Sequence, residues 1–193
     1  MTILSVLDDR ERNSLQTKKL SKGETLFHEG ETCHHIGIMK KGTLIITSYL
    51  ENGSQIIYNT LNKDEMFGNN LLFSSSPYYK GDVLAEENSE VVLIEKEDLL
   101  FLLSENPGFL KEYLKIQSDA GKNLHFRIRL LSIDSARERF FYYMHEHSNV
   151  VRISSVSSLA RQLLLSRETL SRLLSTLTKE KRIIKEGNVI RLL

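Results

Sequence analysis

The chain of 193 residues has one cysteine, two prolines and no tryptophan. One cysteine cannot close an intramolecular disulfide, so a disulfide-stabilised scaffold is excluded and we expect a reducing compartment, the cytoplasm. The first apolar cluster, Ile3 to Leu7, is shorter than the ~7 to 15 residue core of a signal peptide, and no later run approaches the ~18 apolar residues of a membrane span. With 40% hydrophobic and 26% charged residues, the composition is that of an ordinary globular chain.

The chain has almost no excess of either charge, since its net charge is +1, but the charges are unevenly distributed. Residues 1–106 contain 10 Lys and Arg against 17 Asp and Glu, whereas residues 148–193 contain 9 against 3. We therefore expect the C-terminal segment alone to face a polyanion such as double-stranded DNA. The alternative is that this basic segment is only a solvated surface.

Short apolar or alternating runs, separated by turn residues, fill the segment from Lys22 to Glu95. Strands are predicted at Thr25 to His28, His35 to Lys40, Thr43 to Leu50, Ser54 to Leu61 and Val91 to Ile94. Turn sequences such as Glu51-Asn52-Gly53 are typical of closely connected antiparallel strands. Many short strands at this spacing predict a barrel, roll or sandwich. A helix over residues 97–105 follows, and Asn106-Pro107 ends it.

A different period begins at Pro107. Seven positions, five of them apolar, follow one another at alternating steps of four and three: Leu110, Leu114, Gln117, Gly121, Leu124, Ile128 and Leu131. This heptad spacing, called the seam below, predicts a long helix over residues 107–133 that forms a dimer. The predicted dimer-interface residues are Leu114, Gly121, Leu124, Ile128 and Leu131. The alternative is that this face packs on the chain's own β domain; Gln117 in the seam weakens a pure coiled-coil interpretation.

The sequence of the C-terminal segment predicts three helices and a β-hairpin. Asp134 or Ser135 caps a helix that runs to about Glu146, and Ser155 and Ser166 each cap a further short helix. The apolar residues of the two short helices are Leu159, Ala160, Leu163, Leu165, Leu170, Leu173, Leu174 and Leu177. Strand, tight turn and strand follow over residues 182–192. This order predicts a winged helix-turn-helix in residues 134–193.

The second short helix has polar side chains on its outward face, near its N-terminal end. They are Ser166, Arg167, Glu168, Thr169, Ser171 and Arg172. A helix in the major groove contacts base edges from this end, where Arg pairs bidentately with guanine and Glu accepts from cytosine. Lys181 and Lys185, near the wing, are expected to bind phosphates. The alternative is that Arg167, Glu168 and Arg172 form ion pairs on an ordinary helix surface.

The run Ser166-Arg167-Glu168-Thr169-Leu170-Ser171-Arg172-Leu173-Leu174 closely resembles the recognition helix of the Crp/Fnr family of bacterial transcription regulators. Residues 22–27, 29–31, 41–42 and 67–68 resemble the β-roll of the same family, in the same order. The resemblance covers nearly the whole chain. It implies an α+β fold: an antiparallel, jelly-roll-like sensor domain of the cyclic-nucleotide-binding type in residues 1–106, a dimerisation helix and a winged helix. It also implies a DNA-binding homodimer that contacts RNA polymerase.

The segment after Phe67 departs from the pattern of the nucleotide-binding members. Those members have Phe-Gly-Glu and, later, an Arg followed by Ser or Thr, which bind the ribose and the cyclic phosphate. Here Asn69 stands at the Glu position, and Tyr79 and Lys80 stand at the Arg and Ser/Thr positions. A buried phosphate would lack its charge-assisted Arg pair, so cyclic AMP is not expected to bind. The candidate effector pocket, for another small ligand or none, comprises Phe67, Gly68, Asn69, Asn70, Tyr79 and Lys80.

A second departure lies in the turn between the two short helices. Families of this type usually place Gly there, and this chain has Leu164. We therefore expect either a strained left-handed Leu or a slightly longer first helix.

The histidines and the cysteine do not form a recognisable metal-binding pattern. One cysteine cannot replace the four that hold the iron–sulfur cluster of oxygen-sensing members. Cys33-His34-His35, with His28 nearby, suggests a metal or haem site, but adjacent strand residues point to opposite faces and no carboxylate is spaced to complete a tetrahedron. We therefore expect no metal and no cofactor. The remaining histidines, His125, His145 and His147, are expected on helix surfaces.

Two other classes of protein compete with a transcription regulator. A small metal-dependent enzyme of the cupin type needs two histidines one residue apart on a strand of the roll, and the pair with this spacing, His145 and His147, falls outside the roll. A stand-alone ligand-binding regulatory subunit does not need the basic C-terminal domain. We therefore predict a regulator and not an enzyme.

Overall fold

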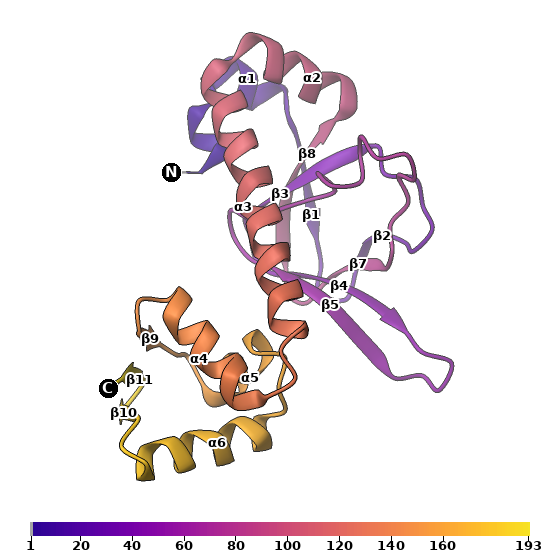
Figure 1. Ribbon diagram of the computed structural model, residues 1–193. Helices are drawn as coiled ribbons and strands as arrows, with labels where there is room; N and C mark the ends of the chain where they lie inside the picture. Colours follow the sequence, from indigo (N-terminus) through magenta and orange to yellow (C-terminus); the bar gives the residue numbers. More distant parts are fainter. Residues whose placement is uncertain (1) are drawn as a thin grey trace. The chain divides into compact units, whose positions relative to one another are not determined.

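The computed structural model describes residues 2–193, which divide into two compact units (Figure 1). The first unit ends at Ser118 and the second is Asp119–Leu193. The boundary falls inside the longest helix, α3 (Pro107–Leu131), which the sequence predicted as a separate segment. Each unit has its own hydrophobic core.

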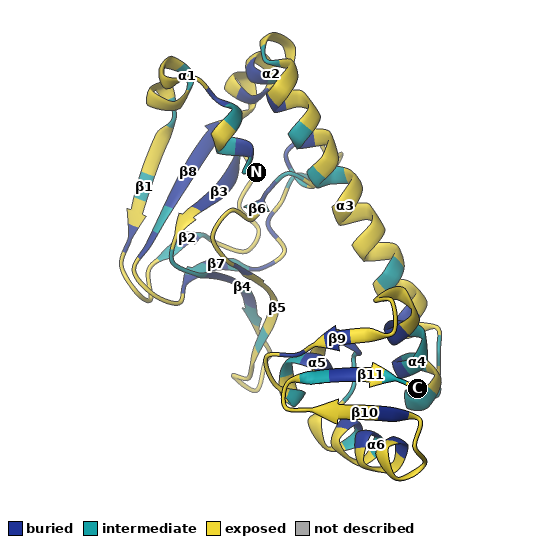
Figure 2. Ribbon diagram, turned by 90° about the vertical axis from the view of Figure 1, so that its left-hand side faces the viewer, coloured by how far each residue is buried: buried dark blue, intermediate teal, exposed yellow. Residues whose placement is uncertain are grey.

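The first unit contains two antiparallel sheets. One has the order β1 (Gln16–Leu20), β8 (Ser89–Glu95), β3 (His35–Lys41) and β6 (Met66–Phe67). The other has the order β2 (Thr25–Phe27), β7 (Asp82–Ala85), β4 (Leu44–Tyr49) and β5 (Gln55–Leu61). Strands β3 and β8 are buried along most of their length (Figure 2). Ile36, Ile38 and Ile94 on these strands are fully enclosed. The antiparallel β-roll predicted from the sequence is therefore confirmed.

The five predicted strands form, each ending within about two residues of its predicted bounds. The prediction missed β1, β6 and β7. Strand β1 consists of Gln16-Thr17-Lys18-Lys19-Leu20 at the edge of its sheet, with only its last residue buried. A polar edge strand has no apolar alternation, so its composition resembles a loop.

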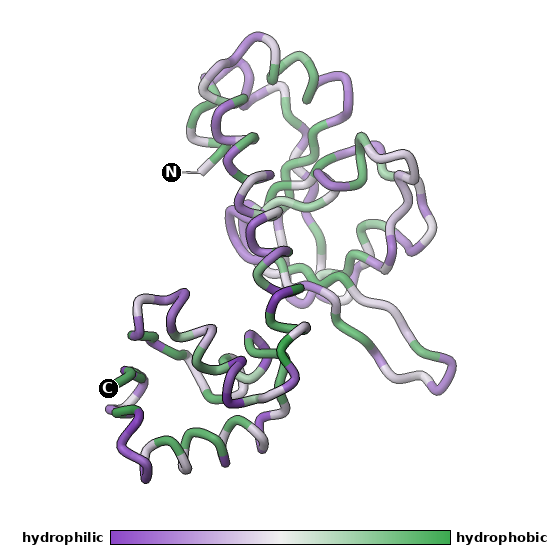
Figure 3. The backbone as a smooth tube through the Cα atoms, viewed as in Figure 1, coloured by the Kyte–Doolittle hydropathy of each residue, from purple (hydrophilic) through white to green (hydrophobic). Residues whose placement is uncertain are grey.

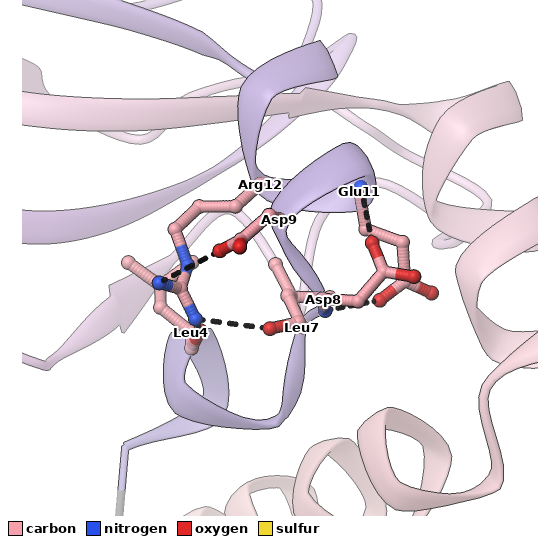
Figure 4. Close-up of polar contacts among 6 residues, drawn as sticks. All are labelled: Leu4, Leu7, Asp8, Asp9, Glu11 and Arg12. Carbon is pink, nitrogen blue, oxygen red and sulfur yellow. Dashed lines mark hydrogen bonds and ion pairs between the residues drawn. The ribbon is translucent and has the colours of Figure 1, made fainter.

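Short helices close the first unit: η1 (Ile3–Val6), α1 (Asp9–Ser14) and α2 (Lys96–Glu105). The sequence prediction missed the first two. A capping box begins α1, because the Asp8 side chain accepts from the Glu11 amide and the Glu11 side chain accepts from the Asp8 amide, both at 2.8 Å (Figure 4). The Arg12 guanidinium donates to the Leu7 carbonyl at 2.9 Å and so holds the preceding turn.

The second unit is a winged helix-turn-helix, as predicted. After the last part of α3, its elements are α4 (Ala136–Glu146), β9 (Val150–Arg152), α5 (Val156–Gln162), α6 (Arg167–Lys179), β10 (Ile183–Glu186) and β11 (Val189–Leu192). The three strands pair antiparallel in the order β10, β11, β9. Ser135, rather than Asp134, caps α4, and Ser155 and Ser166 cap α5 and α6. The core includes Phe140, Met144, Leu159, Leu163, Leu170, Leu177 and Ile190.

The turn between α5 and α6 contains the left-handed leucine that the sequence allowed. Leu164 has φ of 55°, and α5 ends at Gln162. The Leu165 amide donates to the Ala160 carbonyl at 2.9 Å, which closes the end of the helix. The Arg139 guanidinium donates to the Leu164 carbonyl at 2.9 Å. Hydrogen bonds on both sides of Leu164 thus hold a conformation that usually favours glycine.

We expect the Leu164→Gly variant to be more stable than Leu164→Ala by about 1 kcal/mol, because both remove the side chain and only glycine removes the left-handed strain. The free energy of unfolding in urea measures the difference. As the control, Ser175 is exposed inside α6, where the Ala variant should be the more stable of the two. An Ala variant at 164 as stable as the Gly variant would show that Leu164 is not strained.

Candidate functional site

Helix α6 presents opposite faces to the core and to solvent. Leu170, Leu174 and Leu177 are buried in the second unit. The predicted base-contacting residues Ser166, Arg167, Glu168, Ser171 and Arg172 are exposed, and Thr169 is half-buried. The apolar anchoring therefore fixes which side chains point away from the unit.

The start of α6 is held by its cap. The Ser166 hydroxyl accepts from the Thr169 amide at 3.0 Å and donates to the Thr169 hydroxyl at 2.9 Å. Arg167 and Glu168 follow in the first turn, where a carboxylate is favoured by the helix dipole. The ion pairs formed among residues 2–193 include neither Arg167, Glu168 nor Arg172. This disagrees with the alternative that these three side chains pair with one another.

An ion pair ties the far end of α6 to α4. The Arg137 guanidinium donates two hydrogen bonds to the Glu180 carboxylate, at 2.6 and 3.1 Å. The bond from Arg137 lowers the pKa of Glu180 below its usual range. Arg137 and Arg182 also lie over the Phe141 ring, 5.7 and 5.5 Å from its centroid. These contacts link α4, the end of α6 and the start of the wing.

Arg139 holds the turn between α5 and α6. Nothing in the sequence pointed to a role for this residue. Its guanidinium donates to the carbonyls of Ile133 and Leu164, at 2.6 and 2.9 Å. It therefore joins the entry to α4 to the turn that begins α6. No sequence signal distinguishes Arg137 or Arg139 from ordinary surface arginines, because the partners Glu180 and Leu164 are 43 and 25 residues away.

The wing places its lysines in solvent. Lys181 lies in the turn after α6 with φ of 55°, and Lys185 lies on β10; both are exposed. The strand pair β10 and β11 turns at Gly187, whose φ is 57°. Both lysines are therefore exposed on the same unit as α6.

The candidate effector residues do not share one environment. Phe67 and Tyr79 are buried, Gly68 is buried with φ of 78°, and Asn70 and Lys80 are exposed. Asn69 is half-buried and hydrogen-bonds to α3. The structure therefore does not gather all six around one cavity.

Tyr79 occupies the interior of the roll. Its ring stacks on Phe27 with centroids 4.7 Å apart and an interplanar angle of 10°. Burial raises the pKa of the Tyr79 phenol far above its usual range, so the group is uncharged. Among residues 2–193 its hydroxyl finds no hydrogen-bond partner. The position where the resemblance places an arginine thus holds a neutral aromatic ring.

The cysteine and the nearby histidines lie in separate surroundings. Cys33 is buried, with its Sγ 3.2 Å from the His35 carbonyl oxygen and 3.7 Å from that of Gly68. His28 and His35 lie 3.6 Å from different carboxylates. Within the described chain, 2–193, no group of three His, Cys, Asp or Glu residues is placed to hold a metal ion. His125 and His145 are exposed on helices, as expected, and His147 is exposed at the residue after the end of α4.

The seam of α3 is uncovered. The exposed fractions are 36% for Leu110, 54% for Leu114, 59% for Leu124, 55% for Ile128 and 62% for Leu131. Phe109, Tyr113 and Leu130, on other faces of the same helix, are buried, and Figure 2 shows α3 exposed along most of its length. Along α3, hydrophobic and hydrophilic residues alternate (Figure 3). The alternative that the seam packs on the chain's own β domain is therefore wrong for Leu110 and Leu114, the apolar seam residues that lie in the first unit.

Nothing in residues 2–193 forms a helix that is both long and apolar enough to cross a membrane.

Two comparisons with known sequences give matches, one over the roll and one over most of the chain. Residues 17–106 match the family model described as the cyclic nucleotide-binding domain. The anaerobic regulatory protein of Bacillus subtilis (strain 168) is 25% identical over 179 residues, which cover 86% of this chain and 75% of that protein.

Solved structures share the fold. The catabolite activator protein of Thermus thermophilus has a TM-score of 0.56 and 20% identity, covering 99% of this chain and 93% of that one. A CooA variant from Carboxydothermus hydrogenoformans has a TM-score of 0.66 and 16% identity, covering 100% and 91%. These likenesses agree with the roll, long helix and winged helix-turn-helix described above. The solved structures thus share the fold of this chain, residues 17–106 are similar to the cyclic nucleotide-binding domain, and most of the chain is similar to the anaerobic regulatory protein of Bacillus subtilis.

Proposed function

We propose that the protein is a homodimer that binds double-stranded DNA sequence-specifically through α6 and does not respond to cyclic AMP. The observation that carries this proposal is the exposed face of α6, where Arg167, Glu168 and Arg172 are outside the chain's own ion pairs. Groups of opposite charge that form no ion pair among residues 2–193 can bind an external surface that offers both hydrogen-bond donors and hydrogen-bond acceptors. The base edges of the major groove are such a surface.

The chemistry of the three side chains suits G·C pairs. An arginine donates two parallel hydrogen bonds to O6 and N7 of guanine, and a glutamate accepts from N4 of cytosine. Arg167 and Arg172 lie on either side of Glu168 along α6, so they can meet neighbouring base pairs. Ser166, Thr169 and Ser171 supply short hydroxyl groups for phosphates or bases.

The charge of the C-terminal segment supports phosphate binding. Residues 148–193 carry 9 Lys and Arg against 3 Asp and Glu, and Lys181 and Lys185 are exposed. Such lysines add affinity that does not depend on base sequence and that falls with salt. As a DNA-bound regulator, the protein is further proposed to contact RNA polymerase and to work in the cytoplasm, where the thiol of Cys33 stays reduced.

The uncovered seam supports the dimer. Leu114, Leu124, Ile128 and Leu131 each have more than half of their area exposed, and Gly121 has open space where a Cβ would lie. A second copy of α3 would bury the apolar side chains, and the glycine would permit close approach of the two helices. The dimer would then present two copies of α6 to two half-sites about one helical turn apart.

The structure of the roll supports the proposal that the effector is a molecule other than cyclic AMP, or that the protein has no effector. Tyr79 fills the interior with an uncharged ring, and Lys80 lies in solvent. A cyclic phosphate buried here would have no bidentate cationic partner. We propose no metal or cofactor for the protein.

Truncating Arg167 or Arg172 to Ala should cost roughly 1 to 3 kcal/mol of binding free energy at the cognate operator and relax the preference at one base position. Changing Lys181 or Lys185 to Ala should weaken binding to all sequences alike and flatten the salt dependence. A base-by-base operator scan at fixed salt compares the variants. If the arginine variants lose equal binding free energy on operator and random DNA, Arg167 and Arg172 contact phosphates and not bases.

Replacing Leu124 and Ile128 together with Asp should yield a monomer at micromolar concentration, because each side chain contributes ~1.5 to 3 kcal/mol when buried. Sedimentation velocity measures the species. Asn123→Asp adds a charge to an exposed position of α3 outside the seam and should leave the dimer intact. A double variant that stays dimeric would place the interface elsewhere.

Calorimetric titration with cyclic AMP should give no measurable heat of binding, since Tyr79 replaces the arginine that the phosphate needs. The experiment uses the full chain at micromolar concentration. A dissociation constant in the micromolar range or tighter contradicts the proposed loss of cyclic-AMP binding and shows that another group holds the phosphate.

A further inference from the structure

Within the first unit, two amide side chains join the roll to α3. The Asn69 amide nitrogen donates to Gln117 Oε1 at 2.9 Å. The Gln117 amide nitrogen donates to the Asn69 carbonyl at 3.3 Å and to the Tyr113 hydroxyl at 2.8 Å. Both ends of the Gln117 side chain are therefore bonded, and two of the three bonds cross from helix to roll.

Asn69 projects from a firmly held piece of backbone. Gly68, which precedes it, has φ of 78°, and a Cβ there would lie 2.6 Å from the His35 carbonyl oxygen. The Gly68 carbonyl accepts from the amides of Leu71 and Leu72, both at 2.9 Å. The roll therefore offers the Asn69 amide in a defined position.

Apolar packing and hydrogen bonds restrain the rotation of α3 against the roll in different ways. Phe109 and Tyr113 bury their rings in the first core, and this close packing holds the first turns of the helix. Hydrogen bonds weaken steeply when their angles change. The paired amides thus add a directional restraint on α3 at Gln117, next to the exposed Leu114.

Gln117 belongs to the seam, where heptad spacing calls for an apolar residue. It lies between Leu114 and Gly121, yet its amide is bonded to the roll and is half-buried. Its neighbours Leu110 and Leu114 stay exposed. A polar residue at such a position commonly specifies register at some cost in stability.

We infer that Asn69 and Gln117 are positioning residues for dimer assembly: their pairing sets the rotation of α3 so that Leu110 and Leu114 face a second copy. The inference rests on the proposed dimer. It means that the link between roll and helix is made by the chain's own side chains and needs no bound ligand.

The test uses full-length Asn69→Asp, Gln117→Lys and the double variant, with Asn70→Asp as a matched control because Asn70 is the exposed neighbour. The Asn69→Asp change removes the donor and brings a carboxylate against Gln117 Oε1. It should weaken the dimer roughly three- to tenfold, as loss of a half-buried hydrogen bond does. The double variant should restore the dimer to within about twofold of the original, because an ammonium group donates to the carboxylate across the same gap.

Two measurements separate positioning from plain stability. Sedimentation equilibrium gives the dimer dissociation constant, and urea unfolding in the monomeric Leu124→Asp/Ile128→Asp background gives the stability of the isolated chain. We expect the dimer dissociation constant of the double variant to return to within about twofold of that of the original chain, whether or not its free energy of unfolding also returns. The inference is overturned if Asn69→Asp behaves as Asn70→Asp does, or if the double variant is no better than Asn69→Asp. An unaltered chain that is itself monomeric overturns the proposed dimer, a result distinct from a dimer indifferent to the pair.

Discussion

Different faces of α3 pack on the first core, pack on the second core and expose the apolar residues of the seam. The rest of the structure depends on which residues of α3 lie on each face. Phe109 and Tyr113 are buried in the first core, and Phe126 packs against the second. The apolar residues of the seam from Leu110 to Leu131 use neither of these faces and are exposed, whereas Gln117 is half-buried and bonded to the roll. Because a helix repeats every 3.6 residues, three separate stripes fit on a helix of 25 residues only if each stripe is narrow. Polar contacts such as that of Gln117 then decide which stripe faces which partner.

The winged helix-turn-helix combines an apolar core with arginine ties at its joints. Leucines fix the buried side of α6, while Arg139 and Arg137 hold its beginning and its end through hydrogen bonds to the Leu164 carbonyl and the Glu180 carboxylate. Binding to a base edge tolerates little displacement, because hydrogen bonds fail when donor and acceptor move apart by about half an ångström. The same ties allow a leucine to occupy a left-handed position where glycine is usual. The rigid support of α6 therefore holds its exposed side chains in the fixed positions that binding to base edges requires.

Much of this architecture could be predicted from the sequence. Apolar periodicity located α5, α6 and five strands, because it records the positions that these elements bury; it located α3 through the heptad spacing of residues that are exposed in the single chain. The edge strand β1 and the short helix α1 escaped, since neither shows an apolar alternation. The candidate site was predicted in part: side-chain chemistry and position on α6 pointed to Arg167, Glu168 and Arg172. The Asn69–Gln117 and Arg137–Glu180 pairs were not predictable, because residues 48 and 43 positions apart meet only in the folded chain.

The central claim is that two copies of α6 bind one DNA duplex at two half-sites. Hydroxyl-radical footprinting on a selected operator, with the number of chains per duplex determined on the same sample, tests it directly. The account predicts two protected patches about 10 base pairs apart on one face of the duplex, with two chains bound. One patch bound by a single chain, or protection no stronger than on random DNA at the same salt, would contradict it.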